Sequence, residues 1–260
     1  MAETWYNHLG LCADYSVANL TLAADIGAQW IRTAPEYGWN IAPSTIKTQT
    51  DAIRAKGMKH LVVVQYNAGG TKPHTYDKVL TDPTTRAAFI NWIAELAKVT
   101  DAVEIGNEWN LTAVFWQGTY DKTWTQQAKL MYDVAVACKK ANPNIVPDAN
   151  HPGWWAVKRN RTVWFGGTAS GTSGSWIWPA IAKYGVPIWN TEFGQKRIDF
   201  ASGAAAATHM GYYFDEYESQ KAAGIKVAMH IVISKKAFDG DWTLDFDTKM
   251  RIKSQSLKVW

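Results

Sequence analysis

The stretch HLVVVQY, residues 60 to 66, is a continuous apolar run that ends in two polar side chains. Strands with this pattern are buried on both faces, as in a parallel sheet that helices cover on each side. Similar short runs recur along the chain, and most are followed by an amphipathic segment. We expect eight strands, at residues 9–13, 29–33, 60–66, 102–107, 144–147, 162–165, 187–191 and 226–233.

Helical patterns separate these runs. They are expected at residues 17–26, 44–55, 83–96, 125–140, 175–184 and 204–223. Gly27 and Gly57 follow the first two helices as stop signals, and Asp82-Pro83 pairs an N-cap with a proline at the first helical position. Alternating strands and helices over 260 residues predict an α/β fold, a (β/α)8 TIM barrel forming a single compact domain over residues 1–260. An open doubly wound sheet is the alternative, but no glycine-rich phosphate turn follows the first strand.

Composition excludes several classes of protein. Hydrophobic residues make up 47% and charged residues 19%, so the chain can bury a large core. The net charge of +4 is scattered, with no run of Lys or Arg longer than two, so no nucleic-acid partner is expected. No apolar run reaches transmembrane length, and we expect no membrane partner and a monomer. Cys12 and Cys138 are expected to be free, buried thiols.

Aromatic content is unusual, with fifteen tryptophans. A flat apolar ring with one N–H donor suits the apolar face of a sugar. Near expected loops or strand ends, the candidates for sugar contacts are Trp39, Trp116, Trp154 and Trp242. Packing within loops or the core is the alternative for each of them.

Two glutamates stand where a barrel places its chemistry, at the carboxyl ends of strands. Glu108 lies in VEIGNEWN, residues 103–110, at the end of the fourth strand. Glu192 lies in PIWNTEFG, residues 187–194, at the end of the seventh. By strict alternation Glu104 and Glu108 share one face of the fourth strand, and Asn190 and Glu192 share one face of the seventh. Two carboxylates on either side of one bond are what glycoside hydrolysis requires.

Together, VEIGNEWN and PIWNTEFG resemble the paired signatures of glycoside hydrolase clan A, which consists of retaining (β/α)8 enzymes. The resemblance implies that Glu108 is the acid/base and Glu192 the nucleophile, with Asn107 binding the sugar 2-hydroxyl. The stretch QWIRTAPEYGW, residues 29–39, adds Arg32 at the end of the second strand. There the resemblance implies that Arg32 keeps the nucleophile ionised, whereas a structural ion pair is the alternative.

The chain departs from the clan in two places. The clan often has a His-x-Tyr pair near its sixth strand, and residues 161–171, RTVWFGGTASG, contain none. Tyr66, Tyr37 and His151 are alternatives for that tyrosine. The tryptophan that commonly ends the eighth strand is also missing; Trp242 lies well beyond that strand, and His230 in mid-strand is either a core or a site residue.

The resemblance implies a retaining β-glycosidase that cuts inside a β-linked polysaccharide, such as a β-glucan, mannan, xylan or cell-wall glycan. The six histidines show no ligand spacing, so neither metal nor cofactor is expected. A catalytically inactive sugar-binding barrel is the alternative, and a barrel acting on phosphorylated metabolites is disfavoured. We expect action outside the cell or on its wall. Because a glycan at the Asn110 sequon would crowd the cleft, a bacterial or viral source is expected.

Overall fold

A computed structural model describes the chain in segments. They are residues 8–33, 41–64, 77–105, 124–145, 188–194, 199–222, 227–233, 236–237, 240–241, 244 and 246–259. Contacts divide the chain into two compact units, one made of residues 1–32 and 153–260 and the other of residues 33–152. The single domain expected over residues 1–260 stays a prediction.

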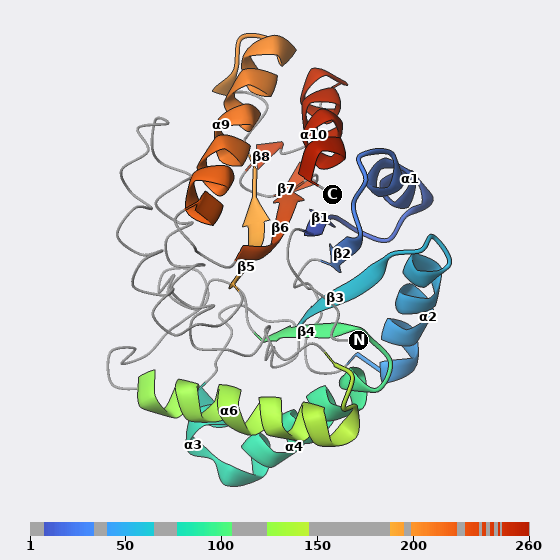
Figure 1. Cartoon of the computed structure of the whole chain (residues 1–260). Helices are drawn as coiled ribbons and strands as arrows, with labels where there is room; N and C mark the ends of the chain where they lie inside the picture. The colour runs from blue at the N-terminus through green and yellow to red at the C-terminus, as the bar shows by residue number, and fades with distance from the viewer. Residues whose placement is uncertain are drawn as a thin grey trace. The chain divides into compact units, whose positions relative to one another are not determined.

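The first unit is built on four parallel strands (Figure 1). In sheet order they are β2 (Trp30–Thr33), β1 (His8–Cys12), β6 (Val227–Ile233) and β5 (Ile188–Phe193). The ladder between β1 and β2 continues at both ends, because Gln29 N–H donates to Leu9 O at 2.8 Å and Ala13 N–H donates to Arg32 O at 3.1 Å. Parallel pairing was predicted from the apolar runs and is confirmed for these strands.

Three helices belong to this unit. They are α1 (Val17–Asp25), α9 (Gly203–Ala222) and α10 (Phe246–Val259). Gly27, with φ of 79°, follows α1 in the left-handed conformation that its missing side chain allows. Helices α9 and α10 lie side by side (Figure 1). They meet closely at Gly211, where an added Cβ would lie 2.7 Å from Arg251 Nη2.

The second unit has two described strands and four described helices. The strands are β3 (Lys59–Val64) and β4 (Ala102–Ile105), which pair in parallel. The helices are α2 (Pro43–Arg54), α3 (Asp77–Thr81), α4 (Pro83–Ala97) and α6 (Trp124–Ala141). Helix α4 packs against α6 and α3 (Figure 1). Gly57, with φ of 75°, follows α2 as predicted.

Helix α4 begins at the N-cap that the sequence predicts. The Asp82 carboxylate accepts hydrogen bonds from the N–H groups of Thr84 at 3.3 Å and Thr85 at 3.1 Å, and from the Thr85 hydroxyl. Pro83 occupies the first turn, where no N–H is needed. These contacts satisfy donors that would otherwise lack a partner.

Asp82→Ala should therefore lower the free energy of unfolding by about 1 kcal/mol, because two helical N–H groups lose their acceptor. Asp82→Asn is the matched control and should lose only a small part of this, since its amide oxygen still accepts. Urea denaturation of both variants measures the difference. Equal stability of the alanine variant and the wild type would contradict the capping role.

Not every expected element lies where the sequence placed it. The strand expected at 144–147 does not begin at Asn144, because Pro143 and Asn144 form a turn that Ile145 N–H closes by donating to Asn142 O at 3.1 Å. Helices α3 and α10 and the short antiparallel pair β7 (Lys236–Ala237) and β8 (Gly240–Asp241) were not predicted. The strand expected at 162–165 and the helix expected at 175–184 lie outside the described residues.

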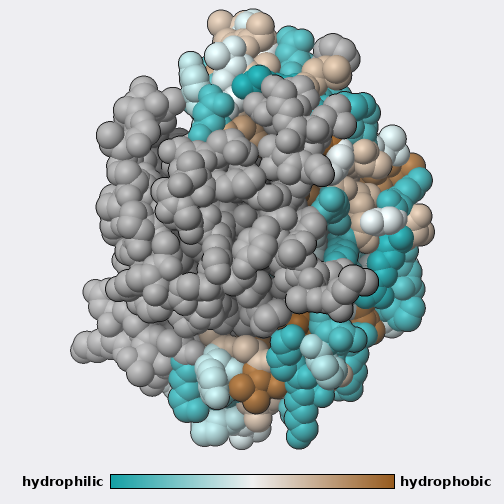
Figure 2. All heavy atoms as spheres, in the orientation of Figure 1, coloured by the Kyte–Doolittle hydropathy of each residue, from teal (hydrophilic) through white to brown (hydrophobic). Residues whose placement is uncertain are grey.

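The described surface is largely hydrophilic on the face that Figure 2 shows, with small hydrophobic patches between. Among the side chains that the structure describes, the large hydrophobic ones that remain exposed are Tyr15, Val17, Tyr132, Val136, Tyr212 and Met250. No helix within the described segments is long and apolar enough to cross a membrane.

Candidate active site

Arg32 is the predicted site residue that the structure describes most fully. It lies on β2, next to the last residue of the strand, and its side chain is completely buried. Its Nη1 donates a hydrogen bond to Cys12 Sγ at 3.2 Å. A guanidinium holds its charge at any accessible pH, so this is a permanent cation at the carboxyl end of β2. The expected position of Arg32 is confirmed, and its expected role stays a prediction.

Glu192 lies at the same edge of the sheet. One rung joins Ile31, Leu11, Val232 and Phe193 across the four strands. The next rung toward the carboxyl edge joins Arg32, Cys12 and Ile233. Because Glu192 directly precedes Phe193, its backbone lies within two rungs of Arg32. Three strand spacings, about 14 Å along the sheet, separate the two strands.

Strand β5 does not keep a strict alternation. Its pairing with β6 shifts between Ile188 and Trp189 and again between Asn190 and Phe193. The second shift leaves two residues of β5, Thr191 and Glu192, opposite one of β6, Ile231, because Asn190 pairs with His230 and Phe193 pairs with Val232. The even alternation expected from Ile188 to Glu192 is therefore interrupted just where Glu192 stands. Such irregularities commonly redirect a side chain next to an active site.

Strand β4 ends three residues before the predicted acid/base, Glu108, in the sequence. The His60 ring contacts helix α2 through Thr50, so His60, Val62 and Val64 lie on the helix side of β3. Val63, on the other side, pairs with Glu104 of β4. Glu104 is thus on the face turned away from α2, where it is completely buried and has an interaction partner.

Most other predicted site residues cannot be placed. Glu108 and Asn107 lie outside the described residues, and so do the aromatic and histidine candidates Trp39, Tyr66, Trp116, His151, Trp154 and Trp242. Tyr37 also lies outside them. His230 is described only by its backbone, which pairs with Leu9 and Asn190. Retention, which depends on the gap between the two carboxyl groups, remains a prediction.

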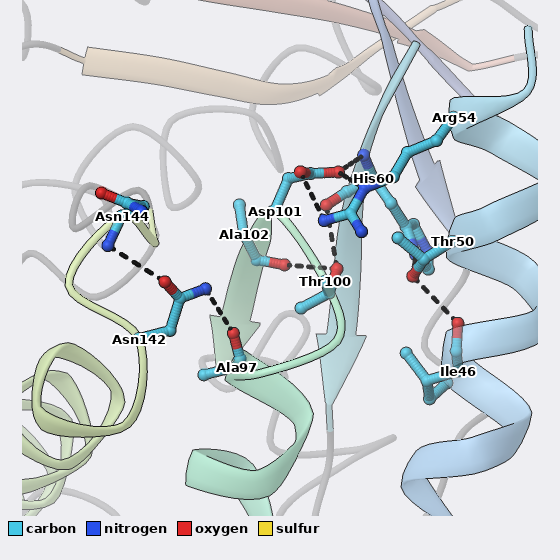
Figure 3. A network of polar contacts seen from close by, with 10 residues as sticks. All are labelled: Ile46, Thr50, Arg54, His60, Ala97, Thr100, Asp101, Ala102, Asn142 and Asn144. Carbon is cyan, nitrogen blue, oxygen red and sulfur yellow. Dashed lines mark hydrogen bonds and ion pairs between the residues drawn. The ribbon is translucent and has the colours of Figure 1, made fainter. Parts of the chain in front are cut away.

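A polar cluster that the sequence did not reveal surrounds His60 at the amino end of β3 (Figure 3). His60 Nε2 lies 3.0 Å from the Thr33 hydroxyl, and Nδ1 lies 2.8 Å from the Thr50 hydroxyl. The Thr50 hydroxyl donates its proton to Ile46 O at 2.9 Å, so it must accept from Nδ1–H. Nε2 then accepts from Thr33, which fixes one neutral tautomer.

Side chains also hydrogen-bond to the backbone of His60. Asp101 Oδ2 accepts from His60 N–H at 2.9 Å, and the Thr100 hydroxyl donates to His60 O at 3.0 Å. Arg54 Nη2 donates to Asp101 Oδ1 at 2.9 Å. Burial lowers the pKa of His60 to about 3, with the Arg54 charge adding to this and the Asp101 carboxylate opposing it. A ring that stays neutral and carries two hydroxyl partners is a structural element of the strand and no proton donor for catalysis.

The two thiols are free and buried, as predicted. Cys12 Sγ accepts a hydrogen bond from Arg32, which lies twenty positions away in the sequence. The sequence did not indicate this contact. In the segments that the structure describes, no group of three His, Cys, Asp or Glu side chains is placed to hold a metal ion.

No protein-family model matches the chain, and no curated protein matches it by sequence. Solved structures do match. A GH5-4 broad-specificity endoglucanase from Clostridium longisporum aligns with a TM-score of 0.66 at 12% identity, covering 99% of this chain and 98% of that one. A GH113 β-1,4-mannanase aligns at 0.55 and 11% identity, covering 96% and 98%. A GH128 endo-β-1,3-glucanase from Amycolatopsis mediterranei, in complex with laminaripentaose, aligns at 0.50 and 12% identity, covering 95% and 98%.

The chain has the fold of the TIM-barrel glycosidases. The predicted (β/α)8 barrel is therefore confirmed, and so is the resemblance to clan A, at the level of the fold. In this TIM barrel, β5 and β6 are the strands predicted as the seventh and eighth. Arg32 and Glu192 stand at the carboxyl ends of their strands, the end at which such barrels carry their catalytic groups.

Proposed function

We propose that this TIM barrel is a retaining β-glycoside hydrolase that cuts inside a β-linked polysaccharide. The observation that supports this most directly is the shared position of Arg32 and Glu192, at the carboxyl edge of one parallel sheet in a glycosidase fold. A buried permanent cation that reaches the carboxylate across the barrel mouth would favour its ionised form, which a nucleophile needs. A closed barrel also curves, so inward side chains from strands three apart converge at its mouth.

The reaction has two steps in this proposal. The Glu192 carboxylate attacks the anomeric carbon and forms a glycosyl ester, while Glu108 protonates the oxygen of the departing sugar. Glu108 then removes a proton from water, which attacks the anomeric carbon and releases Glu192. Each step inverts the configuration, so the product retains it. Asn107 would bind the 2-hydroxyl of the sugar in the reacting position.

The proposed substrates are β-glucan, mannan, xylan or a cell-wall glycan. The structural neighbours support the glucan and mannan part of this range, since they include an endoglucanase, a mannanase and an endo-β-1,3-glucanase. Trp39, Tyr66, Trp116, His151, Trp154 and Trp242 are proposed to contact the polymer. We further propose a monomer without cofactor that acts outside the cell or on its wall, because such polymers do not cross membranes.

A panel of soluble β-1,4-glucan, β-1,3-glucan, mannan, xylan and bacterial wall glycan tests the proposal. We expect at least one polymer to gain reducing ends while its viscosity falls early, as internal cleavage requires. Proton NMR of the first product should show the β anomer, and EDTA should leave the rate unchanged. Binding without cleavage on every polymer would favour the inactive sugar-binding barrel, and an α anomer would exclude the double displacement.

A further inference from the structure

The chain opens onto the surface directly after β1, unlike at the ends of β2 and β5. Thr33, which ends β2, and Gly194, which follows β5, are both buried, whereas residues 14–18 are all exposed. Tyr15 leaves 40% of its surface in contact with solvent, and Val17 leaves 76%. An aromatic ring and an aliphatic side chain are therefore accessible at the carboxyl edge of the sheet that carries Glu192.

Asp14 precedes these two residues and is fixed by hydrogen bonds. Its Oδ1 accepts from Ser16 N–H at 2.8 Å and from Asn19 Nδ2 at 2.8 Å. Hydrogen bonding from the Ser16 side chain lowers the pKa of Asp14; partial burial opposes this, and the Ser16 N–H and Asn19 add to it. An ionised carboxylate has about four acceptor sites, so Oδ2 can accept further hydrogen bonds. Asp14 is thus a charged acceptor that is held in place and open to solvent.

The separation between Asp14 and Glu192 limits what Asp14 can do. Strand β6 lies between β1 and β5, so the two strands are two strand spacings apart, about 10 Å along the sheet. Asp14 also follows Leu11 by three residues, whereas Glu192 precedes Phe193, which lies on the same rung as Leu11. Asp14 is therefore too far from Glu192 to act on the bond that Glu192 attacks. A polymer that runs along this edge can reach both.

We propose that Asp14 and Tyr15 form a subsite that binds an uncharged sugar of the substrate polymer, away from the bond that is cut. This inference rests on the function proposed above, because the polymer is the substrate of that reaction. The Tyr15 ring packs against the apolar face of the sugar, and Asp14 accepts hydrogen bonds from its hydroxyl groups. An acidic sugar would bring a second negative charge close to Asp14, so the subsite selects neutral polymers.

Calorimetry tests the subsite in proteins that also carry Glu192→Gln, so that the ligand is not cut. The ligands are disaccharides and hexasaccharides of β-1,4-glucan, β-1,3-glucan and β-1,4-mannan. The hexasaccharide that binds most tightly is then compared with its derivative in which carboxylates replace the primary hydroxyl groups. The variants are Tyr15→Ala, Tyr15→Phe, which keeps the ring, and Asp14→Asn, which keeps an acceptor oxygen. Tyr132→Ala, which removes another exposed tyrosine, on α6, is the matched control.

We expect Tyr15→Ala to weaken binding of the hexasaccharide about tenfold and to leave binding of the disaccharide unchanged, because only the longer ligand reaches the subsite from the reacting position. Tyr15→Phe and Tyr132→Ala should bind both ligands as the parent protein does. Asp14→Asn should weaken binding of the neutral hexasaccharide about threefold, because its hydrogen bonds lose the assistance of a charge. The acidic derivative should lose less affinity or gain some, because the repulsion is removed.

Equal binding of the hexasaccharide by Tyr15→Ala and the parent protein would overturn the subsite, even if the wild type cleaves the polymer. An unchanged preference for the neutral ligand in Asp14→Asn would overturn its selectivity, and so would a parent protein that binds no hexasaccharide. If Tyr15→Ala loses affinity but the wild type cleaves no polymer, the subsite stands and the proposed hydrolysis falls.

Discussion

Glu192→Ala is expected to lower kcat by a factor on the order of 10³ or more, because no other group can form the glycosyl ester. Added azide should restore part of the rate and give a glycosyl azide of inverted configuration, since the small anion enters the space that the carboxylate leaves. Steady-state kinetics and product NMR measure both effects. The fold should stay intact, as circular dichroism can verify.

Glu108→Ala is expected to show a different dependence on the substrate. Loss of the acid should slow cleavage of polysaccharides strongly, but a dinitrophenyl glycoside, whose leaving group needs no proton, should form the glycosyl-enzyme at nearly the normal rate. Azide should then give a product of retained configuration. Glu95→Ala is the control, because this carboxylate on α4 is exposed and bonded only to Lys98 among the described contacts. Near wild-type cleavage of polymer by either site variant would refute the assignment.

The largest expected effect on stability belongs to His60. His60→Leu should lower the free energy of unfolding at pH 7 by about 3 kcal/mol, because the hydroxyls of Thr33 and Thr50 lose their ring partner inside the protein. Urea denaturation measures the change.

A sharper test is how the difference in unfolding free energy between the wild type and His60→Leu depends on pH. Between pH 6.5 and about 3 the unfolded chain binds a proton at His60 that the folded chain does not, so the wild type loses stability as the pH falls through this window. The leucine variant lacks that loss, and its deficit should shrink steadily from pH 7 to pH 4. Thr33→Val keeps the ring and should show a deficit that does not shrink. A constant deficit for His60→Leu would show that His60 is not a buried neutral base.

Local signals in the sequence predicted much of the fold. Asp82-Pro83 marks the start of α4, and Gly27 and Gly57 mark helix ends, because caps and left-handed glycines act within a few residues. The sequence did not predict helix α10, because most of its side chains are polar. Among its described side chains, Ile252 is the one hydrophobic residue that is buried. Strands β7 and β8, with two residues each, are too short for any periodicity.

The sequence could not predict the features of the site that depend on strand register. Neither the shifts in β5 nor the pairing of Cys12 with Arg32 can be seen along one strand, because both depend on how a second strand is aligned. The His60 cluster combines hydroxyls from β2 and α2, which share no sequence pattern. Residue types and strand ends, by contrast, were enough to place Arg32 and Glu192 at one edge.

The burial of both native thiols has a practical consequence for spectroscopy. A thiol-directed dye or spin label approaching the folded protein finds neither Cys12 nor Cys138 within reach. A cysteine introduced at an exposed position, such as Tyr132 on α6, would then be labelled alone, with no need to remove the native pair first. Binding of a polysaccharide can then be followed by fluorescence or electron paramagnetic resonance in a protein that keeps the hydrogen bond between Arg32 and Cys12.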